Sequence, residues 1–99
     1  MLNINKIDNG AELTVMLEGR LDTMTAPQLE ADMADCLENV SELVIDMTGL
    51  EYISSAGLRV LLSLQKTMNK KGSMVVRNAT EEVMEIFEVT GFSEILTIE

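Results

Sequence analysis

Residues 43–62 decide the fold, and they run LVIDMTGLEYISSAGLRVLL. The segment opens with three consecutive apolar residues, Leu43–Ile45, which are too few for a helix and predict a short buried strand. The turn-like residues 46–49 follow, and after Ser54 the apolar residues recur at helical spacing, as at Leu58 and Leu61. A buried strand followed by a one-sided helix is typical of an α/β fold, and we expect this strand at the centre of the sheet.

The residues before this segment predict a hairpin and a first helix. Residues 13–18 alternate between apolar and polar, the period of a strand, and residues 2–7 are expected to pair with them across the turn 8–10. From Thr25 the apolar spacing becomes helical, and Thr25 and Gln28 have the spacing of a capping box. The buried face expected for this helix consists of Leu29, Met33, Cys36, Leu37 and Val40.

The residues after it continue the alternation of helices and strands. Gly72 ends the second helix, residues 74–76 predict a strand, a third helix is capped by Asn78 or Thr80, and residues 95–98 predict a last strand. The order is ββαβαβαβ, which favours a mixed, largely parallel sheet packed with α-helices. Periodicity leaves open whether the helices lie on one side of the sheet or on both.

Length and composition describe one globular domain. The chain has 99 residues, 46% of them hydrophobic and only three aromatic, so residues 1–99 are expected to form a single domain with an aliphatic core. Seventeen acidic and seven basic residues give a net charge of −10, which repels nucleic acid phosphates and anionic lipid surfaces. We therefore expect a protein partner, and neither nucleic acid nor membrane insertion.

The chain lacks the residues of several common catalytic and metal sites. Without histidine the Ser-His-Asp and Cys-His arrangements and the usual zinc sites are excluded, and the lone Cys36 excludes an internal disulfide. We expect Cys36 to pack in the core and Asp46 to form a turn rather than bind a metal. With no signal-peptide pattern and no apolar run near the roughly 20 residues of a membrane span, a cytoplasmic protein without metal or cofactor is expected.

Two loops are candidate positions for a functional site. In open α/β sheets such sites form where loops leave the carboxyl ends of strands, and residues 19–24 and 51–57 both hold that position. Ser55 is expected at or next to the N-cap of the second helix, where serine serves more often for capping than for chemistry. The doublet with Ser54 lets one serine cap while the other stays free. Gly57 in the first helical turn indicates a close approach to the backbone, since glycine there costs about 0.5 to 1 kcal/mol relative to alanine.

The same residues resemble a known family. Residues 52–59 (YISSAGLR), preceded by residues 44–50 (VIDMTGL), resemble the signature of STAS domains, and in particular of the stand-alone bacterial anti-sigma factor antagonists. The likeness extends over essentially the whole chain, including residues 19–22 (GRLD) and 90–92 (TGF). It implies the STAS fold for the single domain.

The resemblance also implies a function and a site. In the antagonists the motif is usually Asp-Ser-Ser/Ala-Gly-Leu, and its first serine is phosphorylated by an anti-sigma factor that is also a serine kinase. Aligned on Gly57, that serine is Ser55, and the family's aspartate falls on Ser54. The implied partners are this kinase, whose binding releases the sigma factor, and a serine phosphatase that acts on phosphorylated Ser55. The partner-binding residues implied at this edge are Asp22, Thr23, Ser54, Ser55, Ala56, Gly57 and Arg59.

Alternatives remain open because Ser54 supplies no negative charge. Either phosphorylation of Ser55 depends on other acids such as Asp22 or Glu51, or Ser55 is phosphorylated poorly or not at all. The second hypothesis is accordingly a regulatory or scaffold subunit of a larger assembly, for stress sensing or lipid transport, that uses the same surface without phosphorylation of Ser55. An enzyme is the third hypothesis, with Ser54, Ser55, Asp22 and Asp46 as its candidate groups. Nothing in the sequence activates a serine as nucleophile, so no catalytic residue is assigned.

Overall fold

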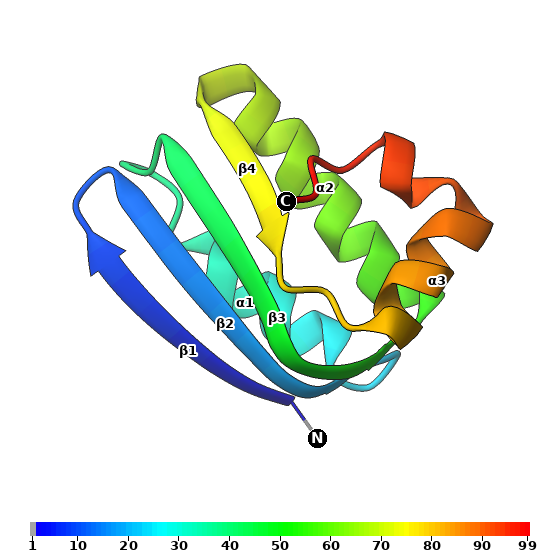
Figure 1. Ribbon diagram of the computed structural model, residues 1–99. Helices are drawn as coiled ribbons and strands as arrows, with labels where there is room; N and C mark the ends of the chain where they lie inside the picture. The colour runs from blue at the N-terminus through cyan, green and yellow to red at the C-terminus, as the bar shows by residue number, and fades with distance from the viewer. Residues whose placement is uncertain (1) are drawn as a thin grey trace.

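One four-stranded sheet and three α-helices make up the computed structural model of the chain, which describes residues 2–99 (Figure 1). The sheet has the order β1-β2-β3-β4, in which β1 and β2 form an antiparallel hairpin and β2, β3 and β4 are parallel. The mixed, largely parallel α/β fold predicted from the sequence is confirmed. In chain order the elements are β1 (Leu2–Asn9), β2 (Glu12–Leu21), α1 (Ala26–Ala34), β3 (Glu42–Ile53), α2 (Ser55–Lys71), β4 (Ser73–Arg77), α3 (Glu81–Thr90) and a 3₁₀ helix, η1 (Phe92–Glu94).

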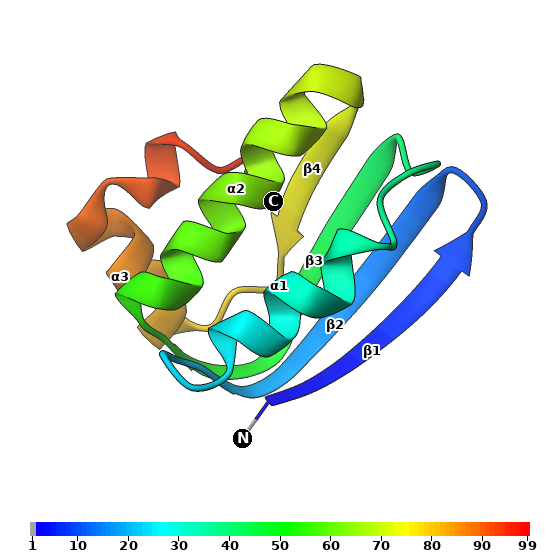
Figure 2. The same cartoon turned by 180° about the vertical axis from the view of Figure 1, so that it is seen from behind.

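Helices α1 and α2 cover one face of the sheet, which answers the question that periodicity left open. Figures 1 and 2 show both helices behind the strands in one view and in front of them in the other, with α3 beside α2 at the end of β3. The opposite face carries no helix among residues 2–99. The alternation in β2 fits this arrangement, because Leu13, Val15 and Leu17 are fully buried while the residues between them are partly exposed.

β3 is longer than predicted. Residues 46–49 were expected to form a turn, but they lie inside the strand, and Met47 is fully buried. The prediction is wrong because the turn-forming residues produce an irregularity in the strand instead of ending it: opposite β2, the register shifts twice along β3. Gly49 allows this, since a Cβ at that position would lie 2.5 Å from Cγ of Glu18 on the neighbouring strand.

α1 is shorter than predicted. It ends at Ala34, so Leu37 and Val40 are buried from the loop that leads to β3 rather than from the helix. Cys36 packs against the core from the same loop and is partly exposed. All five apolar residues expected on this helix thus lie in or against the core. The last three, Cys36, Leu37 and Val40, reach it from the loop and not from the helix.

The capping box predicted at Thr25 and Gln28 does not form. Thr25 is the N-cap of α1, but its backbone angles are helical (φ −101°, ψ −18°) and its side chain caps no amide of the helix. The Thr25 hydroxyl donates to the carbonyl oxygen of Arg20 at 2.8 Å instead, and Gln28 Nε2 donates to the carbonyl oxygen of Leu2 at 3.3 Å. Both side chains therefore bind the β-sheet edge rather than the helix end.

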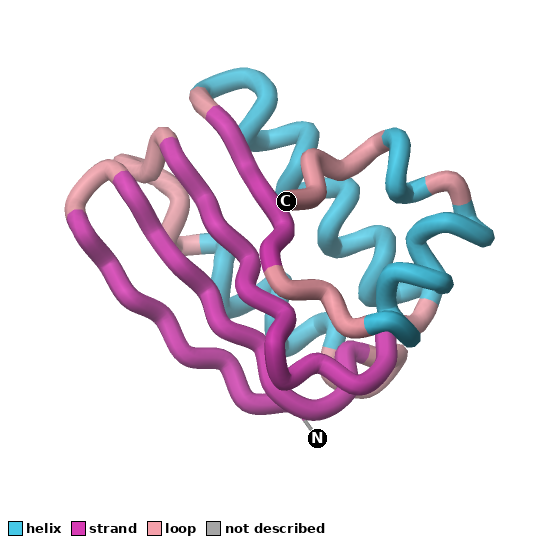
Figure 3. The backbone as a smooth tube through the Cα atoms, in the orientation of Figure 1, coloured by secondary structure: helices cyan, strands magenta, loops and turns pink. Residues whose placement is uncertain are grey.

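The last predicted strand, residues 95–98, is reduced to a single bridge. After η1 the chain runs back beside β4, as Figure 3 shows, and only Ile98 pairs with Val76, in parallel orientation. The amide of Ile95 donates to the carbonyl oxygen of Phe92 at 3.0 Å, and so does the amide of Leu96 at 2.9 Å, so residues 92–96 form a turn and only residues 97–99 hydrogen-bond with β4. Of the two predicted caps of α3, Thr80 is the one used.

Candidate functional site

Two loops meet at the carboxyl edge of the sheet. β2 and β3 end side by side, with Leu21 opposite Ile53, and the amide of Ser54 donates to the carbonyl oxygen of Leu21 at 2.8 Å. The loop before α1 and the start of α2 therefore lie next to each other, at the lower edge of the sheet in Figure 1. Because β2 and β3 are parallel, both loops leave the carboxyl ends of their strands at one edge of the sheet, as predicted.

The two serines at the start of α2 have different tasks. Ser54 is the N-cap: its backbone is extended (φ −96°, ψ 175°), and its Oγ accepts a hydrogen bond from the amide of Gly57 at 3.3 Å. Ser55 is the first residue of the helix, its side chain is exposed, and within residues 2–99 its hydroxyl has no hydrogen-bond partner. The doublet is divided as the sequence predicted, with one serine capping and the other free.

Gly57 lets α2 begin close to the ends of the strands. A Cβ at this position would lie 2.7 Å from Cγ of Leu21, 2.9 Å from Cγ1 of Ile53 and 3.0 Å from the carbonyl oxygen of Leu21. Real Cβ atoms do not approach buried carbon atoms this closely, so only glycine fits without displacing the core. The close backbone approach inferred from the sequence is confirmed.

Asp22 braces the loop before α1. Its Oδ1 accepts hydrogen bonds from the amides of Met24 at 3.0 Å and Thr25 at 3.1 Å, and its Oδ2 lies 3.8 Å from Nε of Arg20. Desolvation raises the pKa of Asp22, but the hydrogen bonds from Thr25 and Met24 together with the charge of Arg20 outweigh it, so the pKa lies below its ordinary value. Asp22 is thus ionised at neutral pH beside the Ser54–Ser55 doublet.

Three side chains at this edge were not singled out from the sequence. Arg20 lies over the ring of Tyr52, with 4.4 Å between the guanidinium carbon and the ring centroid, which is an attractive cation–π contact. Met24 is 86% exposed in the loop that Asp22 braces. The contact between Arg20 and Tyr52 follows from the strand register, because the two residues are directly opposite each other in the parallel β2–β3 pair.

A hollow of about 230 Å³ lies between α1 and the first turns of α2. It is lined by Thr23, Pro27 and Glu30 on one side and by Ala56 and Arg59 on the other. Three predicted partner-binding residues, Thr23, Ala56 and Arg59, are therefore brought together around one depression. With Asp22, Ser54 and Ser55 they form what we call the Ser55 surface, whereas Gly57, which was also predicted to bind the partner, is buried beneath it.

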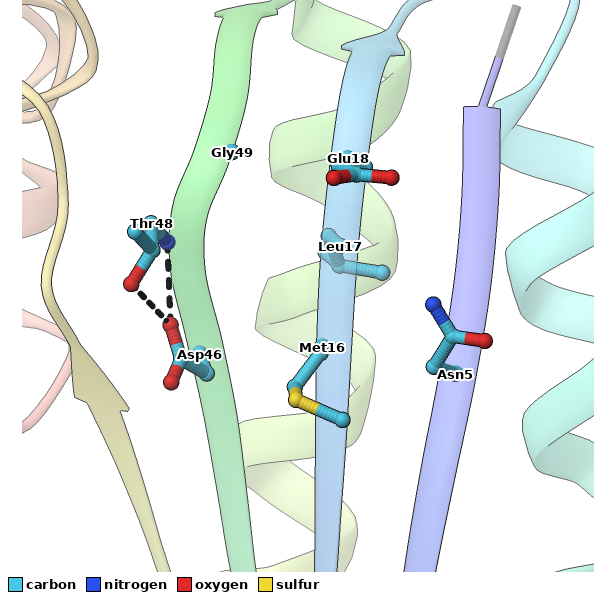
Figure 4. A pocket seen from close by; sticks show the side chains of 7 residues that line it. All are labelled: Asn5, Met16, Leu17, Glu18, Asp46, Thr48 and Gly49. Atoms are coloured by element: carbon cyan, nitrogen blue, oxygen red, sulfur yellow. Dashed lines mark hydrogen bonds between the residues drawn. The ribbon is translucent and has the colours of Figure 1, made fainter.

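A second hollow, of about 250 Å³, lies on the uncovered face of the sheet (Figure 4). Asp46 on its wall accepts hydrogen bonds from the hydroxyl and the amide of Thr48, at 2.6 and 2.9 Å, which are the main reason that the pKa of Asp46 lies below its ordinary value. Asp46 thus stabilises the irregularity in β3 rather than a turn after it. Among residues 2–99 no group of three His, Cys, Asp or Glu side chains is placed to hold a metal ion.

No helix in the described part of the chain, residues 2–99, is long and apolar enough to cross a membrane.

Comparison with protein families matches residues 3–99 to the STAS domain. The chain is therefore a STAS domain. BtrV of Bordetella bronchiseptica is 36% identical to this STAS domain over 99 residues, which cover 98% of the chain and 84% of BtrV. The anti-sigma-B factor antagonist of Bacillus subtilis is 28% identical over 98 residues, covering 98% of the chain and 90% of that protein.

The fold is also similar to that of a solved structure, an anti-sigma factor antagonist from Mycobacterium paratuberculosis. The TM-score is 0.89 at 22% sequence identity, and the similarity covers 99% of this STAS domain and 85% of the other chain. The resemblance stated from the sequence is thus confirmed for both family and fold.

Proposed function

We propose that this STAS domain is an anti-sigma factor antagonist that works by partner switching. It binds an anti-sigma factor through the Ser55 surface, which releases the sigma factor, and phosphorylation of Ser55 by that anti-sigma factor ends the binding. A serine phosphatase restores the active form. The domain acts in the cytoplasm, where sigma factors bind RNA polymerase, and it acts by binding rather than as an enzyme. The Bacillus subtilis relative is named an anti-sigma-B factor antagonist, and this similarity supports the antagonist function.

One observation carries this proposal: Ser55 is an exposed hydroxyl without a structural task. The neighbouring Ser54 provides the cap of α2, so Ser55 is available to a kinase at no cost to the helix. The residues around it are small, Ala56 and Gly57 on the helix and Thr23 in the facing loop, and they leave room for the flat contact of a partner. Met24, in the loop before α1, and Tyr52, two residues before Ser54, are exposed and supply apolar contact area.

Phosphorylation acts on the interface rather than on the fold. The phosphate adds about −1.5 to −2 charges and displaces no hydrogen bond, because the Ser55 hydroxyl makes none within residues 2–99. A unit charge brought to about 6 Å from a like charge at an effective dielectric near 20 costs roughly 2 to 3 kcal/mol. That energy corresponds to a loss of affinity of roughly 30- to 150-fold, which is enough to switch off a micromolar complex.

Ser54 replaces the family's aspartate, and Asp22 lies one residue beyond the end of β2 that contacts Ser54. Asp22 follows Leu21, whose carbonyl oxygen accepts from the Ser54 amide, and its carboxylate is held in place by Met24 and Thr25. We assign it the negative charge that the motif of this chain lacks. Ser54→Asp, which restores the family motif and keeps an N-cap acceptor, is then expected to be phosphorylated at least as fast as the natural chain.

The test combines the full chain with an anti-sigma factor kinase of the same organism and ATP, followed by mass spectrometry of the products. We expect phosphate on Ser55, none in Ser55→Ala, and unchanged modification in the control Ser63→Ala, an exposed serine further along α2. Binding is measured in parallel with the kinase and a non-hydrolysable nucleotide. Phosphate on another residue alone would refute the site assignment.

A second function keeps a specific observation in its favour, the serine in place of the family's aspartate. In that case the same surface binds a regulatory or scaffold assembly, for stress sensing or lipid transport, without modification of Ser55. Tight binding of the partner with no phosphate on the chain after prolonged incubation with ATP would favour this function over the switch.

A further inference from the structure

Ser55 and Arg59 lie one turn apart on the exposed side of α2. They are separated by four positions, and both side chains are exposed. Residues four apart on a helix have Cβ atoms about 5–6 Å from each other, so their side chains meet without any change of the backbone. A group added to the Ser55 hydroxyl is therefore within reach of the Arg59 guanidinium.

Arg59 is the arginine of this edge that is not already engaged. Arg20 lies over Tyr52, with its Nε 3.8 Å from Asp22. Arg59, by contrast, has no carboxylate within 4.0 Å among residues 2–99. Glu30 of α1 lines the same hollow and is the acidic side chain that competes for the guanidinium.

A phosphoserine is a stronger partner for Arg59 than Glu30 is, because it carries about −1.5 to −2 charges and three acceptor oxygens. Building on the proposed phosphorylation of Ser55, we propose that Arg59 binds the phosphate within the same chain and is thereby withdrawn from the partner. In the unphosphorylated protein this guanidinium is the basic group of the Ser55 surface, and it fits a carboxylate of the anti-sigma factor beside the hollow. Phosphorylation then changes the surface twice, adding negative charge and masking the positive one.

A ³¹P NMR titration tests the pairing without a kinase, on the full chain carrying genetically encoded phosphoserine at position 55. A guanidinium favours the dianion, so Arg59→Gln is expected to raise the second pKa of the phosphate by about 0.2 to 0.4 unit, the shift that corresponds to an exposed pair on a helix. Arg59→Lys keeps the charge and is expected to restore most of the shift. Asp22 and Glu30 are present in all variants, so the variants differ only in the side chain at position 59.

Lys66→Gln is the matched control. It removes one positive charge from an exposed position on the same side of α2, eleven residues beyond Ser55 and therefore about 16 Å along the helix. Its expected effect on the phosphate pKa is below about 0.1 unit, because the distance exceeds the screening length of a physiological buffer. Equal phosphate pKa values in the Arg59→Gln and Lys66→Gln chains would overturn the pairing, whatever a kinase does with Ser55.

A binding titration separates this inference from the proposed function. The affinity of the unphosphorylated chain for the anti-sigma factor kinase is expected to fall at least about tenfold with Arg59→Gln and to stay unchanged with Lys66→Gln. If the unaltered chain does not bind the kinase, the proposed function fails while the NMR result stands. If it binds and Arg59→Gln binds equally well, Arg59 is not the group that phosphorylation masks.

Discussion

The helices α2 and α3 begin in the same way but differ in charge. Each has an N-cap whose hydroxyl oxygen accepts from the amide three residues on: Ser54 from Gly57 at 3.3 Å, and Thr80 from Val83 at 3.4 Å. The first turn of α3 contains the acidic pair Glu81–Glu82, whereas the first turn of α2 contains no acidic residue. The position held by Glu81 in α3 is held by Ser55 in α2.

The first turn of α3 already contains acidic residues, whereas the first turn of α2 contains none and begins with an exposed serine. Acidic side chains in the first turn stabilise a helix because they offset the positive end of its dipole. In α3 the sequence supplies that charge permanently, and in α2 it is supplied only by the proposed phosphorylation of Ser55. The free Ser55 hydroxyl is thus a position where negative charge suits the fold and changes only what the surface can bind.

The third helical position is where the two starts differ most in packing, and it gives the largest expected effect. Gly57→Ala places a Cβ within 3.0 Å of Leu21 and Ile53, so we expect the free energy of unfolding to fall by about 1 to 3 kcal/mol despite the higher helix propensity of alanine. Val83 holds the equivalent position in α3 and carries a full side chain. Urea denaturation followed by circular dichroism measures the change.

Ser55→Ala is the control for this experiment, because it alters the same turn at an exposed position. Its expected effect on the free energy of unfolding lies within about 0.5 kcal/mol. An unchanged urea midpoint in Gly57→Ala would show that the strand ends can move away from α2. The claim that only glycine fits at position 57 would then be wrong.

The caps themselves give the next largest effect, and they are not equivalent. Thr80→Ala removes an acceptor for Val83 and also a donor to the carbonyl oxygen of Leu50, at 3.2 Å. We expect it to cost about 1 to 2 kcal/mol, and Ser54→Ala, which loses the contact with Gly57 alone, about 0.5 to 1 kcal/mol. Thr80→Ser keeps both hydrogen bonds and serves as control. Equal losses measured by denaturation would contradict this order.

The sequence predicted that one serine of the Ser54–Ser55 doublet caps α2 while the other stays free, without deciding which, and it did not predict the stack of Arg20 on Tyr52. A doublet before a helix and a glycine in its first turn are local signals, and both held at the predicted positions. The stack depends on register, because two shifts along β3 bring Tyr52 opposite Arg20. Apolar periodicity contains no information about such shifts.

The C-terminal residues show the same limit from another side. Residues 95–98 (ILTI) favour a strand by composition, yet the amides of Ile95 and Leu96 are already bound to the carbonyl oxygen of Phe92. A competing turn decided the local structure there. The fold class was predictable because the alternation of helices and strands is a property of the whole chain, which a single lost strand does not alter.

Asp22 gives a pH-dependent contrast with α3, because the acids of α3 lie in its own first turn, whereas Asp22 lies in the loop before α1, next to the end of β2 that contacts Ser54. The pKa of Asp22 is lower in the folded chain than its ordinary 3.8, so its stabilisation is complete above that value and is lost as the pH falls through the folded-state pKa. We expect Asp22→Asn to lower the free energy of unfolding at neutral pH, and the difference from the natural chain to shrink below pH 3.8. A constant difference across denaturation curves from about pH 2.5 to 7 would contradict this assignment.

Exchanging the charges of the two helix starts gives the smallest effect on stability and the sharpest one on function. Ser55→Asp supplies the acid that α2 lacks and is expected to raise the free energy of unfolding by about 0.3 to 1 kcal/mol, while Glu81→Gln lowers it by a similar amount, both at low salt.

Affinity for the anti-sigma factor is expected to follow the other pattern. Ser55→Asp loses roughly 30- to 150-fold, and Glu81→Gln and the neutral Ser55→Asn lose little. If the chain becomes more stable and at the same time loses its partner, the added charge acts on the binding surface, by repelling the partner or by masking Arg59, and not through damage to α2. If Ser55→Asp instead weakened folding and binding together, the loss of binding would be explained by damage to α2, and the free hydroxyl would not be a switch.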